Sequence, residues 1–177
     1  VFHQGLTPRR AETDYEREGK QRYGKFYEAF EKAYPAKTPM EKRRALLDHW
    51  RDARYGWHIR SWARLQVKNG KAPVYTYYYT RVPPGPLGRR LGAYHGSEIP
   101  YVFGNPDGSR AWGPADKGLS DTMMSYWINF ARTGNPNGQA LPSWPKYDLT
   151  REPSLEIGDA LTVREHVNQR GLDLQEK

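Results

Sequence analysis

The sequence has 177 residues and a formal net charge of +8, and this length suits one domain. It contains no Cys, which excludes a disulfide framework and a thiolate metal site. It has no apolar run of about 18 residues and no basic segment followed by an apolar stretch at its start. We therefore expect neither a membrane span nor a signal peptide. Leu, Ile, Val and Phe account for only 29 residues, but six Trp and thirteen Tyr argue against disorder. The chain is expected to fold around a thin aliphatic core and to need a partner surface.

Residues 1–70 have the spacing typical of helices. Thr7 followed by Pro8 is typical of a helix start, and a polar helix is expected from there to about Arg22. Gly24 predicts an interruption. Around it, aromatic residues recur at helical spacing and predict one face turned to a core: Tyr23, Phe26, Tyr27, Phe30 and Tyr34.

A capping box marks the start of the next helix. Thr38 and Glu41 have the required spacing, and Pro39 stands at the first helical position. We expect a break over residues 52–56 and a further helix over residues 57–69.

The segment 71–167 is richer in strand signals. Residues 72–80 are rich in β-branched and aromatic residues, and both faces are aromatic, which predicts a central strand that is covered on both sides. A loop punctuated by Gly follows over residues 91–104. Residues 154–157 and 161–163 predict a short terminal strand or hairpin.

Two further expectations concern burial. A helix that ends at Gly134 is apolar nearly all round and is expected to be largely buried. It is defined by Leu119, Met123, Tyr126, Trp127 and Phe130. The polar tail 168–177 is expected to fray.

His95 is the strongest candidate for chemistry among the five His. It lies in the loop after the predicted central strand, between Gly92 and Gly96, and such neighbours permit unusual backbone angles. Because ligands gather at the carboxyl ends of such strands, His95 is a candidate general base, with a structural loop histidine as the alternative. His49 and His58 lie among Arg and Trp on predicted helices, where packing or surface roles are expected.

Other chemistries find little support in the sequence. His95 and Glu98 are three residues apart, but no His-Glu-x-x-His helix exists, so no metal site is expected. Neither a Gly-x-Ser-x-Gly turn nor a Walker-type loop occurs, and no cofactor is expected. The basic pairs are scattered, which favours a solvated basic surface over a nucleic-acid partner. They include Arg9 with Arg10, Arg43 with Arg44, and Arg89 with Arg90.

Residues 93–104 read Ala-Tyr-His-Gly-Ser-Glu-Ile-Pro-Tyr-Val-Phe-Gly. This segment resembles the catalytic-histidine segment of type B carboxylesterases, the cholinesterase-like α/β-hydrolases, usually written G-A-x-H-G-x-E-[LI]-P-Y-V-F. Residues 126–138 and 141–147 are similar to the family's C-terminal helix and the loop after it. Residues 73–77 are similar to the strand before the histidine loop.

The resemblance implies a fold and a reaction. Residues 1–177 would form the C-terminal part of an α/β-hydrolase fold, with helices flanking the last strands of a central, mostly parallel sheet, incomplete on its own. The implied reaction is hydrolysis of a small-molecule carboxylic ester through a serine acyl-enzyme, with His95 as the general base. Phe2 and Tyr94 are expected to line the substrate pocket, and Glu98 to be a buried structural partner of the loop.

The sequence also departs from the family pattern. The family's triad runs Ser, Glu, His along the chain. The serine turn is absent here, and residues 1–4 resemble the stretch that comes directly after the family's Glu segment. We therefore expect Ser and Glu on an N-terminal part of the same enzyme, and no activity from residues 1–177 alone. Two alternatives remain: a non-catalytic, adhesion-type member of the same fold, and a basic nucleic-acid-binding module. The absence of Cys leaves the compartment open, with secretion or the periplasm slightly favoured over the cytoplasm.

Overall fold

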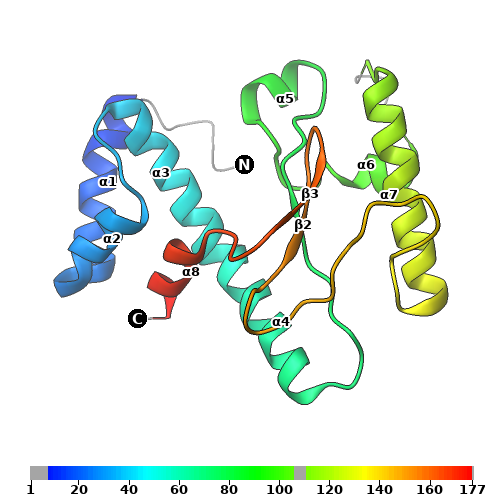
Figure 1. Cartoon of the computed structure of the whole chain (residues 1–177). Coiled ribbons are helices and arrows are strands. Elements are labelled where there is room, and N and C mark those ends of the chain that lie inside the picture. The colour runs from blue at the N-terminus through cyan, green and yellow to red at the C-terminus, as the bar shows by residue number, and fades with distance from the viewer. Residues whose placement is uncertain (1–7, 106–110, 177) are drawn as a thin grey trace. The chain divides into compact units, whose positions relative to one another are not determined.

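The structure of the chain is a computed structural model that describes residues 8–105 and 111–176, with side chains from residue 14 onward (Figure 1). It divides into two compact units. Unit 1 comprises the described parts of Val1–Trp62 and Asn168–Lys177, and unit 2 those of Ala63–Val167. Each unit has a hydrophobic core of its own.

Unit 1 is helical. Its elements are α1 Pro8–Tyr23, the 3₁₀ helix η1 Gly24–Phe26, α2 Tyr27–Ala33, α3 Pro39–Arg51, the π-helical turn η2 Asp52–Gly56, the start of α4 Trp57–Asn69, and α8 Gln169–Gln175. Its core is formed by Tyr15, Phe30, Tyr34, Ala45, Leu46 and Leu174. The predicted interruption at Gly24 is confirmed, and its φ of +47° is one that glycine adopts without strain. The aromatic face is buried at Phe30 and Tyr34, whereas Phe26 is exposed.

The start of α3 has the predicted capping box. Thr38 Oγ1 accepts a hydrogen bond from the Glu41 amide at 3.2 Å, and a Glu41 carboxylate oxygen accepts one from the Thr38 amide at 3.0 Å. The expected break at 52–56 is wrong, because the backbone there stays helical and forms the π turn η2. A Cβ at Gly56 would lie 2.9 Å from Leu172, so this glycine makes room for α8 and does not end a helix.

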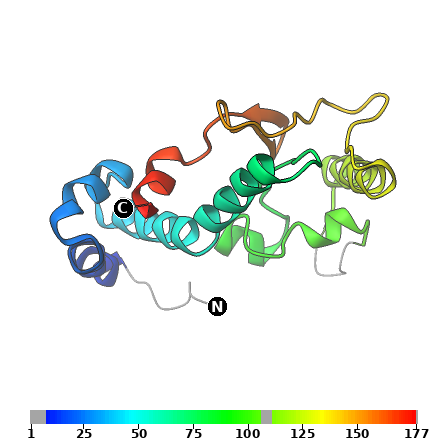
Figure 2. The same ribbon diagram turned by 90° about the horizontal axis from the view of Figure 1, so that it is seen from below.

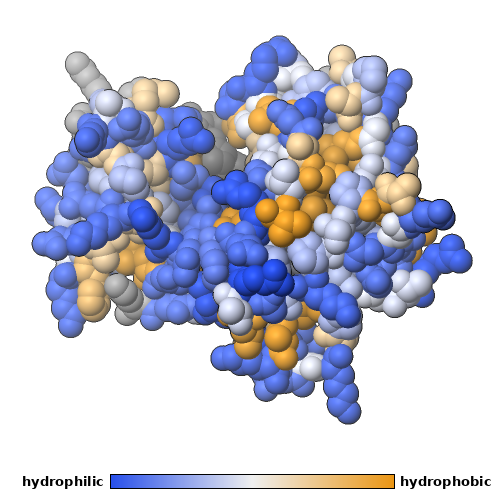
Figure 3. All heavy atoms as spheres, in the orientation of Figure 1, coloured by the Kyte–Doolittle hydropathy of each residue, from blue (hydrophilic) through white to orange (hydrophobic). Residues whose placement is uncertain are grey.

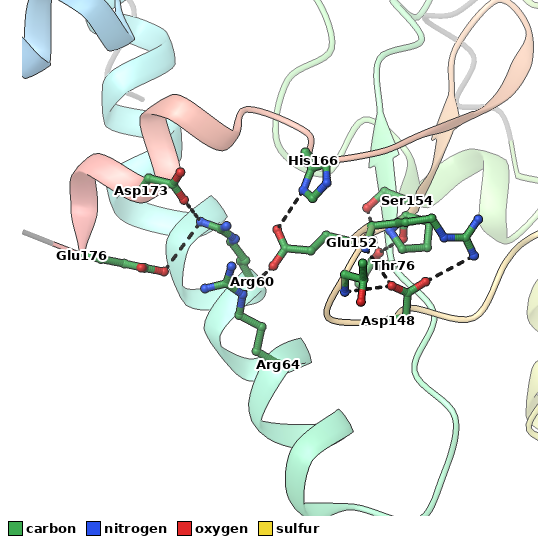
Figure 4. Close-up of polar contacts among 12 residues, drawn as sticks. Arg60, Arg64, Thr76, Asp148, Glu152, Ser154, His166, Asp173 and Glu176 are labelled. Carbon is green, nitrogen blue, oxygen red and sulfur yellow. Dashed lines mark hydrogen bonds and ion pairs between the residues drawn. The ribbon is translucent and has the colours of Figure 1, made fainter.

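The expectation that residues 168–177 fray is also wrong. Residues 169–175 form α8, and its Leu172 and Leu174 are buried. Arg60 contacts Asp173 at 2.6 Å and Glu176 at 3.6 Å (Figure 4). Apolar burial and ion pairing thus order a segment whose composition is polar.

Unit 2 contains a small mixed sheet. Its strands are β1 Tyr77–Tyr79, β2 Ser154–Ile157 and β3 Leu161–Arg164, in the order β1-β2-β3. β1 pairs with β2 in parallel, with Tyr77 opposite Leu155, and β2 pairs with β3 antiparallel. The predicted terminal hairpin is confirmed. The remaining elements are α5 Pro86–Leu91, α6 Ile99–Val102 and α7 Pro114–Thr133.

Helix α7 and the sheet form the core of unit 2. Its buried members are Tyr101, Met123, Tyr126, Trp144, Leu155 and Ile157. α6 packs against α7, as Figures 1 and 2 show. The expectation that α7 is apolar all round and largely buried is wrong, since Ile128 and Phe130 are about half exposed and only one face is buried.

β1 is shorter than the predicted strand and lies at one edge of the three described strands. The Tyr77 side chain is 41% exposed. A central strand covered on both sides stays a prediction about the sheet of the complete fold.

Candidate functional site

His95 lies in the loop that links α5 to α6, and its side chain is exposed. The Ser97 amide donates to the Tyr94 carbonyl at 3.0 Å, which closes a tight turn over His95 and Gly96. Gly96 has a φ of +81°, as the third residue of a type II turn requires. Gly92, at +71°, ends α5. The expected backbone role of the two glycines is confirmed, and it places His95 at the corner of the turn.

Helix α5 is held close to the segment before it. An added Cβ at Gly88 would lie 1.8 Å from the Pro83 carbonyl oxygen, so only glycine allows this approach. The Gly92 amide donates to the Gly88 carbonyl at 2.8 Å and closes the last turn of α5. The loop therefore leaves α5 from a fixed backbone position.

Helix α6 is held on the other side of the loop. Tyr101 is fully buried, and its carbonyl accepts a hydrogen bond from the Ser120 hydroxyl of α7 at 2.8 Å. Ser97 is also fully buried, and its hydroxyl has no hydrogen-bond partner among the described residues. The loop is thus buried on its α6 side while His95 faces solvent.

Glu98 lies close to β1. Burial raises the pKa values of Tyr77 and Tyr79, and the charge of Glu98 adds to both increases. The Glu98 side chain is half-buried. Glu98 is therefore not fully buried as expected, and its structural role in the loop stays a prediction.

Of the two residues predicted to line the substrate pocket, Tyr94 is half-buried and directly precedes His95. Phe2 lies outside the described residues. Two apolar side chains that follow the loop, Ile99 and Phe103 at the two ends of α6, are 52% and 73% exposed. Figure 3 shows further apolar side chains at the surface of unit 2, over the sheet and toward α7.

Two other described histidines have carboxylate neighbours. His49 is fully buried in unit 1, with Nδ1 3.5 Å from Glu18. In unit 2, His166 lies 3.8 Å from Glu152, which also accepts a hydrogen bond from Arg64 (Figure 4). His58 is exposed.

Where side chains are described, over residues 14–105 and 111–176, no group of three or more His, Asp or Glu side chains is suited to a metal ion. Among the helices of these ranges, none combines the length and apolar character needed to cross a bilayer.

Sequence reasoning did not single out Asp116, which the structure places in contact with segments on both sides of the His95 loop. The available signal was local. Gly113-Pro114 followed by a carboxylate at the third helical position is typical of a helix start. Nothing in that pattern indicates Arg81 or Tyr101 as partners, because these contacts arise only when α7 packs.

Comparisons with known proteins identify the family of the chain. The model of the Carboxylesterase family matches residues 3–175. Carboxylesterase 4A of Bos taurus is 48% identical over 82 residues, which are 45% of this chain and 15% of that protein. Carboxylesterase 1C of Rattus norvegicus is 37% identical over 123 residues, which are 68% of this chain and 22% of that protein.

A human relative and a solved structure extend the comparison. Cocaine esterase of Homo sapiens is 42% identical over 92 residues, which are 48% of this chain and 16% of that protein. The solved structure of PNB esterase matches with a TM-score of 0.68 and 26% identity, covering 91% of this chain and 33% of that one. The chain thus spans only 15–22% of the length of the curated relatives named here. The family match nevertheless extends over nearly its whole length, and the chain belongs to the carboxylesterase family.

Proposed function

We propose that this chain is the C-terminal, histidine-bearing part of an α/β-hydrolase that cleaves small-molecule carboxylic esters. The observation that carries the proposal is the family-like segment 93–104, which sets His95 at the exposed corner of a glycine-dependent turn. A general base must reach a hydroxyl group on another segment, and an exposed imidazole on an anchored loop is suited to that task.

In the proposed mechanism, His95 removes the proton from a serine hydroxyl as that hydroxyl attacks the ester carbonyl. The imidazolium then gives the proton to the departing alcohol, which leaves an acyl-serine. A water molecule hydrolyses this ester in the same way, with His95 again as the base. The serine, and a glutamate that orients the imidazole, would lie on an N-terminal part of the enzyme. Phe2 and Tyr94 would line the pocket.

The test uses the full-length protein that contains this chain. His95→Ala should lower kcat for a short-chain ester by roughly 10⁴–10⁶-fold. KM should change little, because the imidazole acts mainly in the transition state. The matched control is His58→Ala, which removes an exposed histidine of α4 and should leave kcat within a few-fold. Circular dichroism checks that both variants are folded.

Retention of more than about a tenth of the wild-type activity in His95→Ala would refute the assignment, because loss of a triad base costs far more. A full-length protein that has no esterase activity would instead favour a non-catalytic, adhesion-type member of the family.

A further inference from the structure

The carboxylate of Asp116 contacts segments on both sides of the His95 loop. Its Oδ1 accepts hydrogen bonds from Arg81 Nε at 3.0 Å and Arg81 Nη2 at 2.7 Å. The same oxygen accepts a hydrogen bond from the Tyr101 hydroxyl at 2.7 Å. Arg81 precedes α5, and Tyr101 belongs to α6. One side chain therefore joins the two ends of the segment that carries His95.

Asp116 itself is firmly placed. It lies at the third position of α7, and its Oδ2 accepts a hydrogen bond from the Gly113 amide at 3.2 Å. It is 4% exposed, and Tyr101 is fully buried. Burial alone would raise the pKa of Asp116, but hydrogen bonds from Tyr101 and Arg81 outweigh it and lower that pKa. The carboxylate therefore stays charged near neutral pH.

Local structure alone does not hold the two tethered segments in place. α6 is only four residues long, too short to be stable by itself. Arg81 also contacts Asp159, but that carboxylate is 88% exposed, and a solvated ion pair contributes little. The Arg81 amide is tied to the Ile157 carbonyl of β2 at 3.1 Å. Asp116 thus links the sheet, α6 and α7 around the loop.

We propose that Asp116 is a positioning residue for His95: by holding Arg81 and Tyr101 together, it fixes the segment 81–101 and thereby the place of the imidazole. The catalytic consequence rests on the proposed ester hydrolysis. A triad base must stand within about 0.5 Å of its productive position, and a shift of about 1 Å costs on the order of 10²-fold in rate. Asp116 does not touch the reacting atoms.

The experiment uses the full-length protein and three variants. Asp116→Asn keeps the size of the side chain but removes the charge that holds Arg81. We expect kcat to fall roughly 10–100-fold with KM within about threefold, because the loop is displaced while the pocket persists. Tyr101→Phe, which removes a single hydroxyl, should give a smaller loss of the same kind. Asp159→Asn is the matched control and should leave kcat within twofold, on the order expected for a solvated pair.

A second readout does not depend on activity. Hydrogen exchange followed by mass spectrometry should show faster exchange in the peptide covering residues 92–98 of Asp116→Asn. Peptides from α3 in unit 1 should be unchanged. Asp116→Glu restores the charge and should recover part of the protection and part of kcat.

The outcomes separate the two proposals. If His95→Ala abolishes turnover but Asp116→Asn changes neither kcat nor loop exchange, the positioning role is overturned and the proposed function stands. If His95→Ala keeps its activity, the proposed function fails, while faster loop exchange in Asp116→Asn would still support the tether. Faster exchange throughout the chain in Asp116→Asn and Tyr101→Phe alike would overturn the positioning role, because it would indicate general destabilisation.

Discussion

The hydroxyl of Tyr23 lies 2.9 Å from Nε2 of His49, whose ring is fully buried in unit 1. Gln175 of α8 donates to the same hydroxyl at 2.8 Å. Burial alone would raise the pKa of Glu18, but its contacts with His49 and Trp50 outweigh that effect and lower the pKa. His49 therefore joins α3 to α1 through a polar network, which agrees with the packing role expected for it.

His49→Ala should destabilise the protein by about 2–4 kcal/mol, because it leaves a cavity and removes a buried partner of Tyr23. Activity per folded molecule should stay within a few-fold. Denaturant unfolding of the full-length protein measures the loss. His58→Ala is the control, and its exposed side chain should cost no more than about 0.5 kcal/mol. Equal effects of the two variants would contradict the role of the network.

Thr38→Ala should cost about 1 kcal/mol, because the Thr38 hydroxyl accepts a hydrogen bond from an amide that has no partner within α3. The control is Thr122→Ala inside α7, where the hydroxyl only donates back to the Gly118 carbonyl and Ala is the better helix former. Thermal unfolding of both variants should show a lower midpoint for Thr38→Ala alone. No shift in that variant would mean that the cap adds nothing to stability.

Raising the pH should destabilise the fold through its buried tyrosines. Burial raises the pKa of Tyr15 to about 12, with smaller contributions from the charges of Tyr27 and Glu31. Burial and the hydrogen bond to Asp116 raise the pKa of Tyr101 to about 12. Unfolding returns each pKa to about 10. The neutral hydroxyls of Tyr15 and Tyr101 therefore make their full contribution to stability below about pH 10. That contribution is lost as the pH rises through about 12.

Absorbance of tyrosinate and circular dichroism, followed together between about pH 9 and 13, test this expectation. A fraction of the thirteen Tyr should ionise only as the helical signal is lost. Tyr15→Phe should make the loss of stability with pH shallower. Ionisation of all tyrosines near pH 10 in a protein that stays folded would show that they are not buried as described.

Residues 1–177 expressed alone should not give a cooperatively folding, active protein. The described strands leave one edge of β1 unpaired, and Trp62 and Phe103 are more than 70% exposed. Open edges and exposed apolar surface favour association of chains. Thermal circular dichroism and an esterase assay on the purified fragment are the measurements. A sharp, reversible transition in a monomer would contradict the first expectation, and turnover would contradict the second.

Several local features could be predicted from the sequence because each depends on neighbouring residues. The capping box of Thr38 and Glu41 needs only their spacing. The turn at His95 needs a residue at Gly96 that tolerates a positive φ. The hairpin of β2 and β3 follows from two short β-rich segments separated by a Gly-containing turn. The family-like segment around His95 likewise identified the candidate base without reference to any distant contact.

Tertiary structure decided the features that depend on segments far apart in the chain. The tail 168–177 is polar, yet α8 forms because Leu172 and Leu174 find an apolar surface on unit 1. The apolar residues of α7 predicted a helix that is largely buried, but packing buries only one of its faces. Asp116 has the local pattern of a helix start, and its role emerges only when folding brings Arg81 and Tyr101 to the same carboxylate. The physical reason is that backbone sterics and short-range hydrogen bonds are properties of neighbouring residues, whereas burial and ion pairing depend on which surfaces meet.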